Sequence, residues 1–175
     1  ISFPNKKVIY GRLEEKLRYG ENPHQLSAIY TGTKNLNIKK IHGKHLSYNN
    51  YNDIFSNLTI SKSLPNKVGT VIVKHTNPCG ISINKDNLKS YQLALACDPI
   101  SAFGGIVACN YKINKKIALE LSKIFLEVII GNGFENDALK ILKKKKNLRI
   151  IDATNFLIEE AINFKSFNNS ILAQS

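Results

Sequence analysis

The sequence lacks methionine and tryptophan entirely, and it has only three cysteines among 175 residues. Three separate cysteines, Cys79, Cys97 and Cys109, are too few for a disulfide framework, so we expect a reducing cytoplasm. No apolar run approaches the roughly 20 residues of a membrane-spanning helix, and no signal peptide pattern is present. Because methionine is absent, we expect Ile1 not to be an initiator and the chain to be part of a longer protein.

Arginine is also scarce, although the formal charge is +12. Of the 25 basic residues, all but Arg12, Arg18 and Arg149 are lysine. Base readout and bidentate phosphate contacts prefer arginine, so the charge does not predict a nucleic-acid partner. The run Lys143-Lys144-Lys145-Lys146 follows a helical pattern and is interpreted as a solvated helix end, with nucleic-acid binding as the weaker alternative.

The residues of a zinc deaminase site are incomplete. Such a site needs His-x-Glu and Pro-Cys-x-x-Cys, whereas here Thr76-Asn77 follow His75 and Gly80-Ile81-Ser82 follow Cys79. We therefore expect no metal. Gly131-Asn132-Gly133 lacks the third glycine of a dinucleotide fingerprint, and no Walker motif occurs, so these glycines are interpreted as a turn.

What the sequence does contain is centred on residues 71–80, VIVKHTNPCG. Val71-Ile72-Val73 predicts a strand buried on both faces, and we expect Pro78 and Gly80 to end regular structure. Lys74 and His75 would then lie at the carboxyl end of a core strand, where parallel sheets bind ligands. An imidazole can transfer a proton and an ammonium can stabilise negative charge. The alternative is a solvated lysine beside a packing histidine.

Strands and helices alternate along the rest of the chain. Strands are predicted at 28–30, 36–38, 68–73, 106–108, 126–130 and 148–151. Helices are predicted to begin near Asp53, Asp86 and Asn114, and a further helix is predicted around Leu139 and Leu142. This order predicts an α/β fold, a layered α/β/α arrangement with a largely parallel or mixed sheet. Residues 1–17 read as a linker or lead-in to one domain over 18–175, and the tail from 157 reads as helix, loop and the start of a strand.

Three further features leave alternatives open. The loop 17–25, LRYGENPHQ, can grip an anion through its Arg, Tyr and His side chains, or it is an ordinary surface loop. Phe103-Gly104-Gly105 allows close backbone approach to a ligand, or is a sterically required turn. Glu127 is the one charge in an apolar run, so it either has a buried partner or faces water from an edge strand.

Five blocks together resemble the AICAR transformylase region of the bifunctional purine biosynthesis protein family. They are residues 17–25, 46–50, 71–80, 98–105 and 125–130, in the family's order and at compatible spacings. The resemblance implies a cytidine-deaminase-like half-domain without zinc, covering about the first half of the transformylase. It also implies that the cyclohydrolase domain and the second half, which carries the family's potassium site and much of its folate site, are absent from this chain.

The resemblance also implies residue roles. His75 would be the proton acceptor, Lys74 would stabilise the transition state, and His24 would lie beside the reacting groups. The remaining matches would contact the substrate: Arg18, Tyr19, Asn50, Phe103, Gly104 and Glu127. Glu127 stands where some members have Asp. Gly131-Asn132-Gly133 departs from the family's usual Ala-Pro, so the resemblance does not predict the conformation of that loop.

The implied reaction is formyl transfer from 10-formyltetrahydrofolate, a co-substrate, to AICAR, giving FAICAR in purine biosynthesis. We expect a cytoplasmic homodimer with sites shared between chains, no nucleic-acid or membrane partner, and an isolated fragment that is inactive. A non-catalytic nucleotide-binding module is the second hypothesis, and a basic nucleic-acid-binding domain is the third; the latter predicts clustered arginines and interleaved aromatics that the sequence lacks.

Overall fold

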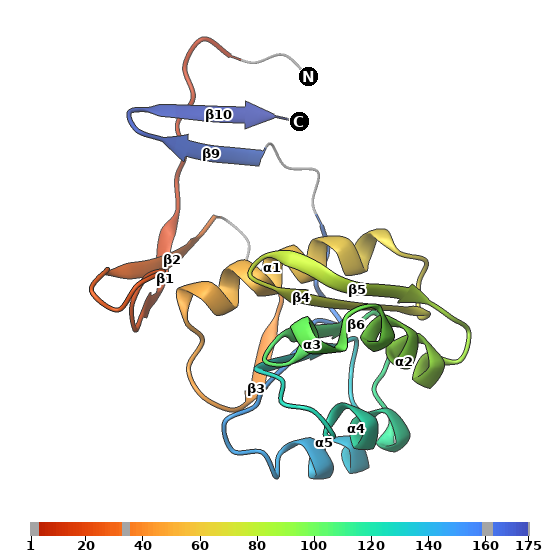
Figure 1. Ribbon diagram of the computed structural model, residues 1–175. Helices are drawn as coiled ribbons and strands as arrows, with labels where there is room; N and C mark the ends of the chain where they lie inside the picture. Colours follow the sequence, from red (N-terminus) through yellow and green to blue (C-terminus); the bar gives the residue numbers. More distant parts are fainter. Residues whose placement is uncertain (1–3, 33–35, 159–162, 175) are drawn as a thin grey trace.

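The computed structural model describes residues 4–32, 36–158 and 163–174 (Figure 1). Its main body is a six-stranded sheet in the order β3-β8-β7-β6-β4-β5. These strands are β3 (Lys39–His42), β4 (Gly69–Lys74), β5 (Asn77–Ile83), β6 (Ile106–Cys109), β7 (Val128–Gly131) and β8 (Arg149–Asp152). The helices are α1 (Tyr48–Ser63), α2 (Asn87–Cys97), α3 (Pro99–Ala102), α4 (Lys115–Leu121) and α5 (Asn136–Leu142). The predicted α/β fold with a layered, mixed sheet is confirmed.

Only the middle of the sheet is parallel. β6, β7 and β8 pair in parallel, joined by the crossover helices α4 and α5. β4 pairs antiparallel with both β5 and β6, and β3 pairs antiparallel with β8. The expectation that Lys74 and His75 follow a parallel strand is therefore wrong, because β4 runs against the direction of β6.

Both faces of the sheet are covered, as the runs of apolar residues in its strands predict. On one face, Ile72, Val107 and Ile129 pack with residues of α2, α4 and α5. On the other face, Ile106 and Val128 pack with residues of α1. Alternate residues of one strand thus enter opposite core clusters, and among the described residues α1 is the one helix on its side of the sheet (Figure 1).

Two helices start at capping residues predicted from the sequence, whereas α1 starts at Tyr48 with Ser47 as its cap, before the predicted start near Asp53. The Asp86 carboxylate accepts hydrogen bonds from the Leu88 and Lys89 amides, and the Asn114 side chain accepts one from the Ile117 amide. Asp98 ends α2 and caps the short α3 through the Ser101 amide. The lysine run begins where α5 ends: Lys143, Lys144 and Lys146 are exposed, while Lys145 is half-buried.

Pro78 and Gly80 do not end regular structure, contrary to the sequence-based expectation. They belong to β5, which forms a tight hairpin with β4. Proline is tolerated there because β5 is the edge strand and the register shifts between Ile72 and Val73, opposite Pro78. The hairpin leaves only His75 and Thr76 between the paired residues Lys74 and Asn77.

The two ends of the chain also differ from expectation. β1 (Arg12–Leu17) pairs with β2 (Ser27–Thr31), so the segment expected to be a lead-in contains a strand. The strand predicted at 36–38 instead starts at Lys39. In the tail, β9 (Asn163–Phe167) and β10 (Ser170–Gln174) form a separate hairpin, and part of the helix expected there falls at 159–162, outside the described residues.

One row of paired residues crosses the sheet and positions the site. Val73 pairs with Ile106, Ile106 with Val128, and Val128 with Arg149. The carboxyl end of β4 therefore lies at the same end of the sheet as the amino ends of β6, β7 and β8. We call this end, which is formed by strand termini and is not the edge strand β5, the sheet edge. Lys74, Gly105 and Glu127 each lie one residue beyond this row on the same side, so they occupy one edge.

Candidate active site

The turn between β4 and β5 presents the Lys-His pair. Lys74 is half-buried, and its ammonium donates a 2.8 Å hydrogen bond to the Phe103 carbonyl. His75 is exposed, and with Thr76 it helps line a hollow of about 180 Å³. Hydrogen bonds from Ser101 hold the pKa of the Asp98 carboxyl below its ordinary value, and the nearby Lys74 charge acts in the same direction. Lys74 therefore lies in a polar setting that contains a compensating carboxylate.

The turn after α3 lies beside Lys74. Gly104 has a φ of +76°, which side chains rarely adopt, and its amide donates to the Phe125 carbonyl. The rings of Phe103 and Phe125 are 5.4 Å apart and both are exposed. The glycine is therefore conformationally required at this turn. The same turn presents an exposed aromatic surface at the sheet edge.

Glu127 has partners on both sides. Its carboxylate accepts a 2.9 Å hydrogen bond from the Asn50 amide and lies 3.6 Å from the Arg149 guanidinium. β7 is an interior strand, so the edge-strand part of the alternative is wrong, but the Glu127 side chain is 42% exposed and therefore faces water in part. Asn50 also closes the capping box of α1 with Ser47, which ties Glu127 to the helix amino terminus.

The loop that connects β1 and β2 lies beside the first turn of α1. It is ordered by its own contacts, since the Gly20 amide donates to the Gln25 carbonyl and the Ser27 hydroxyl to the Tyr19 carbonyl. The side-chain amide of Asn49 donates to the Glu21 carbonyl of the same loop. These bonds hold the loop next to the helix amino terminus.

A second hollow, of about 200 Å³, joins this loop to the sheet edge. It is lined by Arg18, Tyr19, Lys44, His45, Leu46, Ser47 and Arg149. Three cationic side chains and the amino terminus of a 16-residue helix surround it. Helix amino termini and arginine both favour phosphate, so this hollow suits an anion.

The structure brings some predicted site residues together and separates others. Lys74 contacts the Phe103–Gly104 turn, and Asn50 contacts Glu127, all at one sheet edge. Arg18 and Tyr19 line the anion-suited hollow, whereas His75 lines the other one; Glu21 connects their loop to the His75 hollow. His24 is exposed in that loop and lines neither hollow.

Arg149 is the site residue that sequence reasoning missed. Its side chain is mostly buried, and its guanidinium bonds the His45 carbonyl and faces Glu127. Two signals could have indicated it. Arginine occurs only three times in the sequence, and Glu127 directly precedes one strand while Arg149 begins the next strand along the chain. Pairing the two strands in parallel would have brought both charges to one edge.

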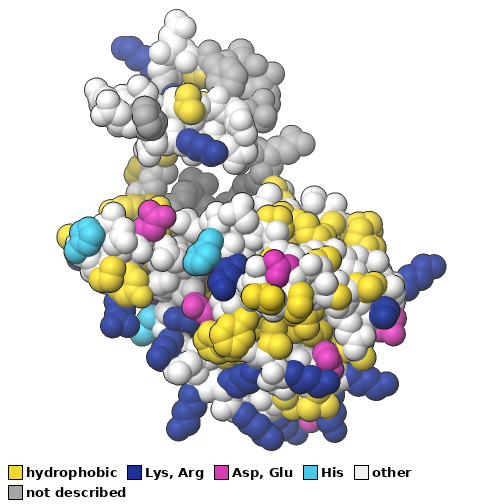
Figure 2. Space-filling view, viewed as in Figure 1, with side chains coloured by type: hydrophobic (Ala, Val, Ile, Leu, Met, Phe, Trp, Pro, Cys, Tyr) yellow, Lys and Arg dark blue, Asp and Glu magenta, His cyan; other side chains and the backbone are white. Residues whose placement is uncertain are grey.

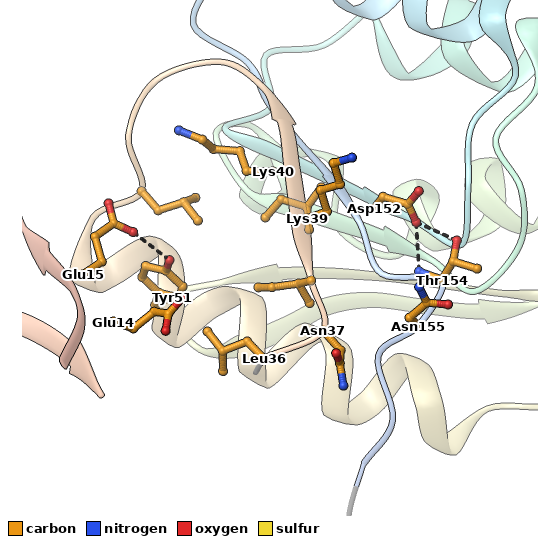
Figure 3. A pocket seen from close by; sticks show the side chains of 13 residues that line it. Glu14, Glu15, Leu36, Asn37, Lys39, Lys40, Tyr51, Asp152, Thr154 and Asn155 are labelled. Carbon is orange, nitrogen blue, oxygen red and sulfur yellow. Dashed lines mark hydrogen bonds between the residues drawn. The ribbon is translucent and has the colours of Figure 1, made fainter. Parts of the chain in front are cut away.

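A larger hollow lies away from these residues. It measures about 560 Å³, and Figure 3 shows Glu14, Glu15 and Tyr51 on one side of it, with Asp152, Thr154 and Asn155 on the other. Burial, with the adjacent Glu15 carboxylate, raises the pKa of Tyr51 to about 12. None of the nine predicted site residues lines it. Size alone therefore does not mark the candidate site.

Comparison with known proteins shows which family the chain belongs to. The family model described as the AICARFT/IMPCHase bienzyme matches residues 2–175. The chain belongs to this family. Among its relatives are proteins named bifunctional purine biosynthesis protein PurH: one from Elusimicrobium minutum is 40% identical over 98% of this chain, and one from Clostridium botulinum is 47% identical over 85%. The chain spans 33% and 30% of these two relatives, about a third of their length.

Three further observations concern the surface, membrane-spanning helices and metal-binding clusters. On the face shown in Figure 2, lysine and arginine side chains lie mostly over the lower part of the molecule, with others scattered above. Within residues 4–32, 36–158 and 163–174, no helix is long and apolar enough to cross a membrane. The same described residues contain no cluster of three or more His, Cys, Asp or Glu that could bind a metal.

Proposed function

We propose that the chain forms the AICAR-binding part of a formyltransferase site. The reaction is transfer of a formyl group from 10-formyltetrahydrofolate to AICAR, giving FAICAR in purine biosynthesis. The observation that carries the proposal is the convergence at one sheet edge of Lys74, Glu127 and the anion-suited hollow. Membership of the AICARFT/IMPCHase family supports it.

In this proposal the nucleotide phosphate enters the hollow lined by Arg18, Tyr19 and Arg149. The guanidinium of Arg18 is exposed and 5.5 Å from the Tyr19 ring, so it is available to an incoming anion. The base and amine of AICAR would extend from there along the sheet edge. Asn50, Glu127 and the Phe103–Gly104 turn are the groups that a substrate in this direction would meet.

The chemistry needs a base and a charge stabiliser. The 5-amino nitrogen of AICAR forms a bond to the formyl carbon, and the bond from that carbon to N10 of the folate breaks. His75 takes the proton from the amine as it attacks, because a neutral imidazole is a base near pH 7, and returns it to N10 of the folate as the bond to the formyl carbon breaks. Lys74 stabilises the formyl oxygen as it gains negative charge. His24, on the neighbouring loop, would approach the reacting groups when substrate binds.

The rest of the proposed assembly lies outside this chain. We propose that 10-formyltetrahydrofolate binds mainly to the second half of the transformylase and that the site is shared in a cytoplasmic homodimer. The IMP cyclohydrolase reaction belongs to the family's other domain. No metal is proposed for this part of the protein.

Calorimetric titration with AICAR tests the nucleotide site. We expect Arg18→Ala to weaken AICAR binding about 10- to 100-fold, because a hydrogen bond to a charged group is lost. Arg12→Ala is the matched control, since Arg12 is exposed on β1 and bonds Tyr10. Equal affinities for Arg18→Ala and the unmodified chain would refute the assignment.

Adding folate to the same titration separates enzyme from binding module. If the complete gene product binds AICAR but never consumes 10-formyltetrahydrofolate, the non-catalytic reading replaces the proposed function. Production of FAICAR supports it.

A further inference from the structure

The turn that carries His75 has an unusual backbone. His75 and Thr76 have φ values of 52° and 62°, so both residues are left-handed. Two-residue hairpin turns of type I′ require this conformation at both central residues, which is why asparagine and glycine dominate them. A left-handed β-branched residue such as Thr76 is a genuine outlier, because its Cβ branches crowd the backbone. Something outside the turn must stabilise it.

The turn's own side chains satisfy only one backbone group. The hydroxyl of Thr76 and the side-chain amide of Asn77 both donate to the His75 carbonyl, at 2.7 and 2.8 Å. The amide and carbonyl of Thr76 have their partners elsewhere, on α1.

Two residues of α1 bind the backbone of Thr76, one at its amide and the other at its carbonyl. The Asp53 carboxylate accepts the Thr76 N–H at 2.7 Å, and the Ser56 hydroxyl donates to the Thr76 carbonyl at 2.8 Å. Residues three apart lie on one helix face, so a single turn of α1 makes both bonds. We call Asp53 and Ser56 the turn clamp.

The helix that carries the turn clamp is itself firmly anchored. Ile54 and Leu58 are buried in the core on the α1 side of the sheet. Between them, the side-chain amide of Asn57 donates to the Ile106 carbonyl at 2.8 Å. The turn clamp therefore fixes the exposed turn relative to the buried core.

We propose that the turn clamp holds the His75–Thr76 turn in its left-handed conformation and so aims the His75 imidazole at the substrate. Asp53 and Ser56 are positioning residues: they act through the Thr76 backbone and not on the reacting atoms. The consequence for catalysis rests on the proposed function, whereas the structural role of the clamp stands without it.

A competing role is available to Asp53. It lines the same hollow as His75, so its negative charge could act directly on the imidazole or on the substrate. Asp53→Asn separates the roles, because the amide keeps an oxygen that accepts the Thr76 N–H and loses the charge. Asp53→Ala removes both.

The structural test is amide hydrogen exchange at Thr76 in the 175-residue chain. We expect Asp53→Ala to speed exchange of the Thr76 N–H at least tenfold and Asp53→Asn to change it much less. Unchanged exchange at Thr76 in Asp53→Ala overturns the proposal, whatever reaction the protein catalyses. Circular dichroism and exchange at core amides of β6 report whether each variant is folded.

The functional test uses kinetics of the complete gene product that carries this chain. Asp53→Ala should lower kcat for formyl transfer about 100-fold, the usual effect of misplacing a catalytic group by about 1 Å, with little change in KM for AICAR. Ser56→Ala should show a smaller fall. Its matched control is Thr59→Ala, which removes a hydroxyl that donates to Phe55 within the same helix.

The decisive variant is the double substitution Asp53→Ala with Thr76→Gly. Glycine adopts a positive φ without strain, so it should restore most of the lost kcat if the clamp only holds the backbone. A double variant as impaired as Asp53→Ala would overturn the proposal, as would loss of kcat in Asp53→Asn equal to that in Asp53→Ala. If no variant or parent transfers formyl groups while Thr76 exchange behaves as expected, the proposed function fails and the clamp remains.

Discussion

At the scale of single residues, the candidate site combines the exposed imidazole of His75 with two charged groups, Lys74 and Glu127, that already have hydrogen-bond partners. Lys74 bonds the Phe103 carbonyl, and Glu127 is held between Asn50 and Arg149. Paired charges keep their positions before a ligand arrives, which is the arrangement that electrostatic catalysis requires. His75 is exposed and presented on a tight turn, so it is the group best placed to exchange a proton with a ligand.

The proton-transfer role of His75 is best tested with His75→Asn. Asparagine tolerates the positive φ of this turn but cannot act as a base at neutral pH, so it removes the chemistry and keeps the backbone. In the complete gene product we expect turnover to fall by about two to four orders of magnitude. AICAR affinity, measured by calorimetry, should change little. Turnover retained in this variant would exclude His75 as the base.

At the scale of elements, short helices join the parallel strands, and their stability depends on caps. The Asn114 side chain accepts a hydrogen bond from the Ile117 amide at the start of α4. Glu135 occupies the corresponding position of α5, and its side chain makes no capping hydrogen bond to a described residue. The two seven-residue helices thus form a natural comparison.

We expect Asn114→Ala to lower the free energy of unfolding by about 1 kcal/mol, the usual value of a lost cap. Glu135→Ala, a surface change without a capping bond, should stay within about 0.5 kcal/mol. Urea unfolding of the 175-residue chain measures both. Equal effects would mean that the Asn114 cap contributes nothing to the stability of α4.

The contact between β5 and α2 depends on a second single residue, Gly80. A Cβ added there would lie 1.9 Å from the Ala94 carbonyl oxygen, so the edge strand and the helix would have to separate. Overpacking of this kind costs about 1–3 kcal/mol, and we expect Gly80→Ala to fall at or above that range. Gly32→Ala is the control, because no described atom lies within 4 Å of its added Cβ. Thermal unfolding compares the two variants.

At the scale of the whole molecule, the site lies where the ends of four strands meet, and the chain is about a third of the length of its relatives. β4 runs against β6, so the carboxyl end of one strand and the amino ends of three others share this edge. The amino terminus of α1 and the β1–β2 loop complete it. We propose that the described residues bind the nucleotide and that the folate is held elsewhere.

We therefore expect the 175-residue chain alone to bind AICAR but not to transfer formyl groups. A base cannot act on a donor that is not positioned, and losing that positioning can raise the barrier by roughly 7–11 kcal/mol. A formyl-transfer assay on the purified chain, with the complete gene product as positive control, measures this. Comparable turnover in the two would show that the whole site is contained in these residues.

The elements that depend on local signals could be predicted from the amino-acid sequence alone. Asp86 and Asn114 start helices because their side chains cap backbone amides within three residues. The apolar runs around Val71, Val107 and Ile129 are buried strands, as an α/β fold requires. The family resemblance carried by the five sequence blocks is also confirmed, because the family model matches residues 2–175.

The directions of the strands and the partners of the site residues could be assigned only from the folded chain. The direction of β4, the pairing of Pro78 in an edge strand and the partners of Glu127 depend on residues tens of positions apart. Local patterns carry no information about such pairings, because an apolar strand satisfies a parallel or an antiparallel neighbour equally well. For the same reason the contacts of Arg149 with Glu127 and of Asp53 with Thr76 could be assigned only from the folded chain.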